Sequence, residues 1–89
     1  MNNANFPQRG VSIESTVAIV AEYHPDSHTV TVTINGGSFA AASKAARDAN
    51  RDRAIDVLRE LESTLIYQYN TEQSEVERII GAALSRVKA

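Results

Sequence analysis

The sequence predicts an α+β domain in which a two-stranded antiparallel β-hairpin packs against a long helix and a shorter C-terminal helix. Residues 11–23 and 29–34 alternate between apolar and polar side chains, as strands with one buried face do. Residues 38–69 begin with alanines and continue with apolar side chains at helical spacing, and a second such stripe follows Ser74. Because the strands come first and the helices follow, the order is typical of α+β folds and not of alternating α/β folds.

Length and composition limit the chain to one small domain. Of its 89 residues, the polar residues 1–10 read as a loose, flexible arm and residues 11–89 as the folded domain. The sequence contains no cysteine, so neither a disulfide framework nor a thiolate metal site can stabilise it. Because a domain of this size is only marginally stable by itself, association with a second copy is the common remedy.

Charge and hydropathy exclude several classes of protein. The net charge of −2 does not suit a general binder of nucleic acid or of membrane surfaces. The first residues lack the basic and apolar regions of a secretory signal, and no apolar run is long enough to span a bilayer. A cytoplasmic location is therefore the simplest expectation. No pattern in the sequence indicates a cofactor.

The two alternating runs also predict how the strands pair. Residues 11–23 read as one long strand, and a four-residue loop at 24–27 would place Tyr23 opposite His28. In that register the apolar residues of both strands lie on one face, and a slip by one residue would destroy the agreement. Pro25 fits the second position of a type I turn inside the loop, because its φ is already fixed there.

The first strand is longer than its partner, which predicts an assembly. Its first portion, Val11 to Ser15, runs past the end of the second strand and has no partner within the chain. An antiparallel homodimer that joins two first strands would supply the partner and give a four-stranded sheet, with Val11, Ile13 and Ser15 in the interface. The alternatives are that this portion packs on its own helices as an extended arm, or that the open sheet edge accepts a strand from another protein.

Helical signals define the second half of the chain. A helix is expected from about Ser38, which would be its N-cap, to Tyr69. Residues 64–70 are also compatible with a third strand, but the helix is the favoured interpretation. Its apolar stripe consists of Ala54, Leu58, Leu61 and Leu65. The C-terminal helix begins with a capping-box pattern, Ser74 and Glu77.

The stretch HPDSH holds both histidines of the chain. His24 and His28, with Asp26 between them, are possible metal ligands, but a catalytic zinc site usually needs three protein ligands with supporting hydrogen bonds. No third ligand accompanies them, so the pattern favours a solvated turn in which Asp26 binds local backbone N–H groups. Residues 36–38, GGS, could bind an anion before the long helix, but they lack the rest of a phosphate-binding loop.

Four acidic residues recur at every fourth position on the outer side of the long helix, and we call them the acidic ridge: Asp48, Asp52, Asp56 and Glu60. They repel one another by about 0.2–0.5 kcal/mol per pair. Arg51 and Arg59, each three residues after an acid, offset part of that repulsion. The ridge is either a solvated face or a surface that docks on a basic partner. Ile55 and Ile66 lie near it and are either part of the same contact patch or covered by the last helix.

A basic row on the same helix offers an alternative function in nucleic-acid binding: Lys44, Arg47 and Arg51. The surrounding stretch GGSFAAASKAARDANRDRAIDVLREL resembles the end of a double-stranded RNA-binding domain. That resemblance implies contacts from these three side chains to duplex RNA. The alternative function is therefore binding of duplex RNA or DNA, with a surface that dimer symmetry would widen. The first helix and the third strand of that family are missing, and acids interrupt the basic face.

The whole chain has a second resemblance, one of general build. The hairpin VAIVAEYHPDSHTVTVTING, leading into an alanine-rich helix, resembles small proteins of phages and mobile elements, including anti-CRISPR inhibitors, in size, acidity and order of elements. That resemblance implies binding to a host complex without chemistry, and it assigns no site residues. There is also no cysteine nucleophile and no G-x-S-x-G motif.

These observations together predict a non-enzymatic protein-binding module, a small accessory or inhibitory protein. It would occlude a basic surface of its partner through the acidic ridge, Ile55 and Ile66. Charge complementarity of this kind mainly raises the rate of association and the specificity of the complex. A structural component, for instance of a virion, is a further alternative.

Overall fold

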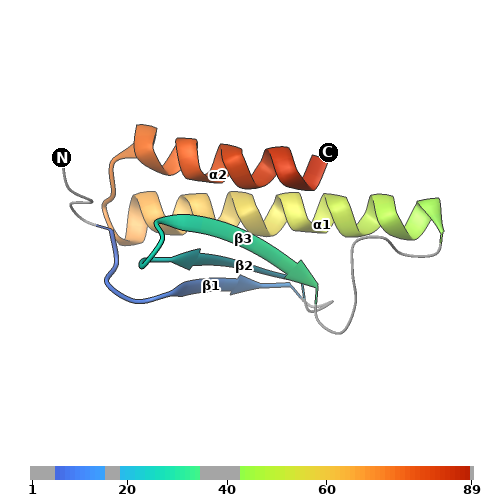
Figure 1. The fold of residues 1–89 in the computed structure, drawn as a ribbon, viewed down its shortest axis with the longest axis horizontal. Helices are drawn as coiled ribbons and strands as arrows, with labels where there is room; N and C mark the ends of the chain where they lie inside the picture. The colour runs from blue at the N-terminus through green and yellow to red at the C-terminus, as the bar shows by residue number, and fades with distance from the viewer. Residues whose placement is uncertain (1–5, 16–18, 35–42, 89) are drawn as a thin grey trace.

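A computed structural model describes residues 6–15, 19–34 and 43–88, and this part of the chain has the predicted α+β class. A three-stranded antiparallel sheet in the order β1-β2-β3 is followed by two helices (Figure 1). The strands are β1 (Val11–Glu14), β2 (Ile19–His24) and β3 (Thr29–Ile34). The helical elements are α1 (Lys44–Ser63), its π-helical continuation η1 (Thr64–Gln68) and α2 (Gln73–Lys88).

The predicted long first strand is wrong, because residues 11–23 fold back into two strands. β1 and β2 pair in antiparallel fashion, with Ile13 opposite Ala21. Each pair of this ladder joins two odd-numbered or two even-numbered residues. Odd-numbered residues therefore face the core in both strands, and the sequence keeps one alternating pattern although the chain reverses direction. The segment also contains no glycine, proline or asparagine, which usually mark a turn. Residues 16–18 lie outside the described part of the chain.

The predicted hairpin between β2 and β3 exists, but its register is shifted by two residues. Tyr23 lies opposite Val30 and not opposite His28, and residues 25–28 form the four-residue loop. His28 takes a left-handed conformation, with φ 55°, at the end of this loop. Because the shift is an even number of residues, the side chains that were predicted to face the core still do so.

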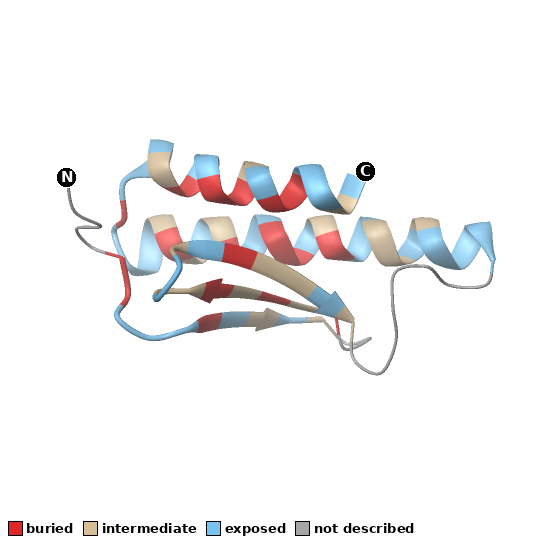
Figure 2. Ribbon diagram, in the orientation of Figure 1, coloured by how far each residue is buried: buried red, intermediate tan, exposed pale blue. Residues whose placement is uncertain are grey.

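Both helices cover the same face of the sheet, and the core lies between the two layers (Figures 1 and 2). α1 packs mainly on β1 and β2, whereas α2 packs on β3. The buried strand residues are Val11, Ile19, Ala21, Tyr23 and Val30. The buried helix residues are Ala54, Val57, Leu58, Leu61, Leu65, Val76, Ile79, Ile80, Ala83 and Leu84. This confirms the apolar stripe of the long helix, and each large side chain buried here contributes about 1.5–3 kcal/mol.

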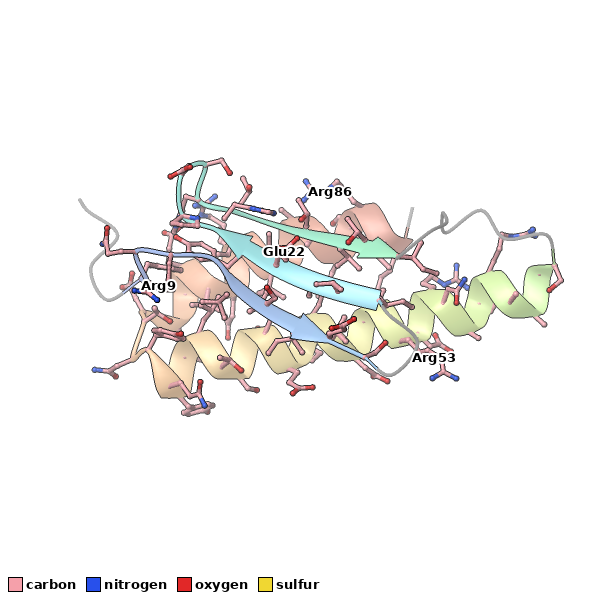
Figure 3. The ribbon with its side chains drawn as sticks, turned by 90° about the horizontal axis from the view of Figure 1, so that it is seen from below. Arg9, Glu22, Arg53 and Arg86 are labelled. Atoms are coloured by element: carbon pink, nitrogen blue, oxygen red, sulfur yellow. The ribbon has the colours of Figure 1, made fainter. Side chains whose placement is uncertain are left out.

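The opposite face of the sheet is mostly polar, and no described helix covers it. Figure 3 shows this face with both helices behind it and Glu22 on the central strand. Side chains of a strand point alternately to the two faces, so every second residue of β1, β2 and β3 lies here. The set consists of Ser12, Glu14, Val20, Glu22, His24, Thr29, Thr31 and Thr33.

The long helix has a different start from the predicted one. α1 begins at Lys44, where the Ser43 hydroxyl accepts a hydrogen bond from the Ala46 N–H over 3.1 Å. Ser38, the predicted N-cap, lies outside the described residues. Residues 64–68 are helical, so the favoured interpretation of this segment is confirmed and a third strand there is excluded.

A buried threonine holds the connection from η1 to α2. The Thr71 hydroxyl and the Thr71 N–H both donate to the Leu65 carbonyl, the N–H over 3.1 Å. α2 then begins at Gln73, so Ser74 lies inside the first turn and the predicted capping box is wrong. Glu77 instead accepts a hydrogen bond from the Gln73 side chain over 2.8 Å, so it does not return to a cap.

The three-stranded sheet removes the reason for the predicted dimer. Val11 and Ile13, which were assigned to the dimer interface, pair with β2 of the same chain. Ser15 also stays within the chain, because its N–H donates to the Ile19 carbonyl over 2.9 Å. Association through the first strands therefore stays a prediction, but it no longer follows from an unpaired portion of the first strand. The outer strands of the described sheet are β1 and β3.

Candidate functional site

The two histidines of the HPDSH turn point to opposite faces of the sheet. His24 Nε2 lies 2.8 Å from the Thr31 hydroxyl on the open face. His28 turns toward the helices, and its Nδ1 lies 3.0 Å from the Tyr23 hydroxyl. Nowhere in residues 6–15, 19–34 and 43–88 do three histidine or acidic side chains gather as metal ligands would, and Asp26 is exposed. The geometry therefore agrees with a turn and not with a shared metal site.

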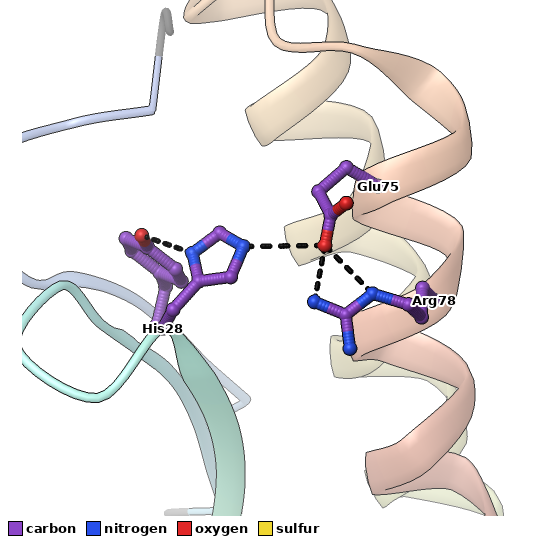
Figure 4. Close-up of polar contacts among 4 residues, drawn as sticks. His28, Glu75 and Arg78 are labelled. Atoms are coloured by element: carbon purple, nitrogen blue, oxygen red, sulfur yellow. Dashed lines mark hydrogen bonds and ion pairs between the residues drawn. The ribbon is translucent and has the colours of Figure 1, made fainter. Parts of the chain in front are cut away.

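His28 belongs to a polar cluster that ties the hairpin turn to the start of α2 (Figure 4). Its Nε2 lies 3.4 Å from Glu75 Oε1, at an ion-pair distance that does not meet the geometry of a hydrogen bond. Arg78 holds the same carboxylate, because its Nε donates to Oε1 over 2.7 Å and its Nη2 donates to the same oxygen. We call Tyr23, His28, Glu75 and Arg78 the histidine clamp.

Aromatic rings enclose the imidazole of this clamp. The ring of Phe6 meets that of His28 edge-on at a centroid distance of 4.5 Å. Phe6 and Tyr23 are buried, so the predicted loose arm is packed on the domain at Phe6 and Pro7, whereas residues 8–10 are exposed. A hydroxyl, an imidazole and a carboxylate in a row also occur in nucleophilic active sites. Here the hydroxyl is enclosed and the carboxylate is bound by arginine, which fits a structural clamp.

Replacing Glu75 with glutamine should reduce stability at neutral pH more than at acidic pH. The hydrogen bond from Arg78 lowers the pKa of Glu75 below its ordinary value of 4.5, and His28 acts in the same direction, against a partial burial that raises the pKa. A carboxylate whose pKa is lowered on folding stabilises the protein above its unfolded pKa, and this contribution is lost as the pH falls through the folded pKa. Urea unfolding across this range measures the difference.

A matched control for this experiment is Glu72→Gln. Glu72 is exposed and has no ion pair with a described residue, so its replacement should leave the acid dependence of stability unchanged. If the wild type and Glu75→Gln still differ at the acidic end, the carboxylate acts through its shape and not through its charge. That result would contradict the electrostatic account of the clamp.

One member of the acidic ridge is neutralised within α1. Asp48 accepts hydrogen bonds from Lys44 Nζ over 2.8 Å and from Arg51 Nη2 over 2.7 Å. The hydrogen bond from Lys44 is the main cause that lowers the pKa of Asp48, and Arg47 contributes through its charge. The basic row is thus engaged around a carboxylate of its own helix, which leaves less positive charge for a phosphate backbone.

The other three members of the acidic ridge are exposed and have no ion pair with any described residue: Asp52, Asp56 and Glu60. Arg59, which was expected to offset the charge of Asp56, binds Glu62 over 3.2 Å instead. The unpaired negative charge of the ridge therefore begins at Asp52, in the middle of α1, and continues to Glu60.

The apolar residues near the ridge are not the exposed ones. Ile55 and Ile66 are partly buried and pack against the core, so they are less accessible than the exposed members of the acidic ridge. The large exposed side chains are aromatic instead, with Tyr67 81% and Tyr69 39% exposed. Sequence reasoning missed these tyrosines because residues 64–70 fitted both a helix and a strand, and the two structures point their side chains in different directions.

Comparison with protein-family models, curated proteins and solved structures found no match to this chain. Within the described residues, no helix is both long and apolar enough to cross a bilayer.

Proposed function

We propose that this protein is a non-enzymatic protein-binding module whose outer α1 surface occludes a basic surface of its partner. One observation carries the proposal: three exposed, unpaired carboxylates on α1 are followed on the same continuous helix by Tyr67, the most exposed aromatic side chain described. Tyrosine is enriched in protein interfaces, and a single-sign surface steers a partner of opposite charge. We call Asp52, Asp56, Glu60 and Tyr67 the α1 surface.

The charges of the α1 surface favour a role in binding, because they do not stabilise the helix that carries them. Like charges at four-residue spacing destabilise a helix slightly, by about 0.2–0.5 kcal/mol per pair. Asp52, Asp56 and Glu60 keep this spacing, and none of them forms an ion pair with a described residue. A basic partner surface would remove the repulsion on binding. The partner class that fits is a protein with clustered lysines and arginines.

Charge reversal on this surface should slow association with the partner. A photo-crosslinking amino acid in place of the exposed Tyr67 first identifies the partner in cells of the source organism. Stopped-flow association is then measured at two salt concentrations for the wild type and for Asp52→Lys/Asp56→Lys. Because steered association exceeds the neutral rate by about ten-fold or more, we expect a loss of about ten-fold and a flatter salt dependence.

The matched control carries the same change of charge elsewhere. Glu14 and Glu72 are exposed acids on β1 and before α2, so Glu14→Lys/Glu72→Lys changes the net charge equally without touching the α1 surface. The control should lose less association rate than the α1 variant. Equal losses in both variants, or no loss in the α1 variant, would contradict the proposed binding surface.

A further inference from the structure

Strand β3 is an edge of the described sheet, and one side chain of α2 reaches across to it. Arg86 Nη2 donates to the Val30 carbonyl over 2.8 Å, although the two residues are 56 positions apart. Figure 3 shows Arg86 beyond the outer side of β3. No described strand lies on that side. The edge therefore presents backbone groups to α2 and to solvent.

The direction of these backbone groups follows from the Arg86 contact. Since the Val30 carbonyl accepts from α2, it points away from β2. Backbone N–H and C=O groups of a strand alternate in direction from one residue to the next. The groups of Val32 and Ile34 therefore point outward as well, whereas those of Thr31 and Thr33 point to β2, opposite Glu22 and Val20.

A groove runs between this edge and α2. Its larger part has a volume of about 400 Å³ and is lined by Thr31, Val32, Thr33, Ala83, Arg86 and Val87. Its smaller part, of about 80 Å³, continues along β3 toward His28 and Arg78, and Arg86 lines both parts. The groove thus combines an unpaired strand edge, small and apolar side chains of α2, and arginines.

We infer that the groove between β3 and α2 binds an extended, acidic peptide segment of another protein, which adds to the sheet as a fourth strand beside β3. Strand addition uses main-chain hydrogen bonds for affinity and side-chain pockets for specificity. The groove supplies outward backbone groups on Val32 and apolar contacts on Ala83 and Val87. Arg86 is the cation of the groove that no described carboxylate binds, because Arg78 is already held by Glu75, so a carboxylate is the complementary side chain.

Arg86 gives this groove a replaceable contact. In the free protein its guanidinium binds a neutral carbonyl, that of Val30. On binding, a peptide N–H can donate to the Val30 carbonyl in place of Arg86, and a peptide carboxylate can accept hydrogen bonds from the Arg86 guanidinium. A carboxylate acceptor adds a second charge and can bind the guanidinium through two parallel hydrogen bonds, which a neutral carbonyl cannot do, so the exchange favours the acidic guest. This site lies apart from the α1 surface and does not depend on it.

Proline substitutions separate strand addition from folding. The N–H of Val32 points outward, so Val32→Pro removes a donor that a guest strand needs and keeps the ladder with β2 intact. Thr31→Pro removes a donor of that ladder and serves as the contrast that should destabilise the fold. Val32→Ala controls for the lost side-chain volume. We expect Val32→Pro to stay folded and to lose peptide binding, and Val32→Ala to retain it.

The probe is a capped eight-residue peptide in which threonine and valine alternate and one valine is replaced by aspartate, compared with a lysine version. Titration of the full-length protein followed by amide NMR should shift Val30, Val32 and Ile34, and the aspartate peptide should bind about ten-fold more tightly. Arg86→Ala should abolish that preference.

Three results would overturn the inference. The first is an absence of shifts along β3, and the second is equal shifts along β1, which would show unspecific edge pairing. The third is a doubled molar mass that Val32→Pro abolishes, which would mean that a second copy of the chain occupies the groove.

Discussion

Replacing Tyr23 with alanine should lower the free energy of unfolding by about 3–5 kcal/mol, the usual cost of truncating a buried aromatic side chain. Tyr23 is 1% exposed and faces the core from the central strand. Its ring lies 5.4 Å from that of Phe6, between centroids, and its hydroxyl reaches His28. The variant therefore loses packing and a member of the histidine clamp together. Urea unfolding followed by circular dichroism measures the change.

The phenylalanine variant separates these two losses. Tyr23→Phe keeps the ring and removes only the hydroxyl, so we expect a loss of about 1–3 kcal/mol from the imidazole nitrogen left without its partner. This loss should disappear when the same substitution is made in a His28→Ala background. Equal losses in both backgrounds would show that the hydroxyl acts without His28, and would contradict the clamp.

A proline at position 13 should destabilise the protein by about 2–4 kcal/mol, through a lost hydrogen bond and an acceptor left without a donor. The Ser15 N–H donates to the Ile19 carbonyl, so by the two-residue period the Ile13 N–H also points to β2, opposite Ala21. Ile13 is moreover packed against the core. Thermal and urea unfolding of Ile13→Pro check this expectation.

The neighbouring position supplies the control and also tests association. The Ser12 N–H points away from β2, so Ser12→Pro should leave stability nearly unchanged. Equal destabilisation by both prolines would contradict the three-stranded sheet. Light scattering over a concentration series completes the test. A dimer that Ser12→Pro dissociates would restore association through the outer edge of β1, whereas a monomer throughout would contradict it.

Periodicity predicted which side chains are buried better than it predicted the path of the chain. The stripe of Ala54, Leu58, Leu61 and Leu65 lies in the core, as helical spacing requires. The reversal between β1 and β2 was not predicted because the apolar residues are odd-numbered in both strands. The alternation therefore looks the same as in one uninterrupted strand. The shift of the hairpin from Tyr23–His28 to Tyr23–Val30 was not predicted for the same reason, since an even shift preserves the faces.

The surfaces were less predictable than the core. Helical spacing identified Asp52, Asp56 and Glu60 as an outward row, but not which of the acids would be neutralised. The histidine clamp and the groove beside β3 both join residues more than forty positions apart, such as His28 with Glu75. Spacing along one element carries no information about such pairs. They follow only from the packing of α2 on β3.

The order of the elements has a kinetic consequence. Each strand pairs only with its neighbour in sequence, so the sheet closes through short loops that cost little entropy. The Arg86–Val30 contact, in contrast, spans 56 residues and requires the last helix to return to an already formed edge. Among these contacts, the docking of α2 on β3 therefore closes the longest loop and has the largest entropy cost of closure. A guest strand beside β3 would lie along this same contact, the one that joins the most distant parts of the sequence.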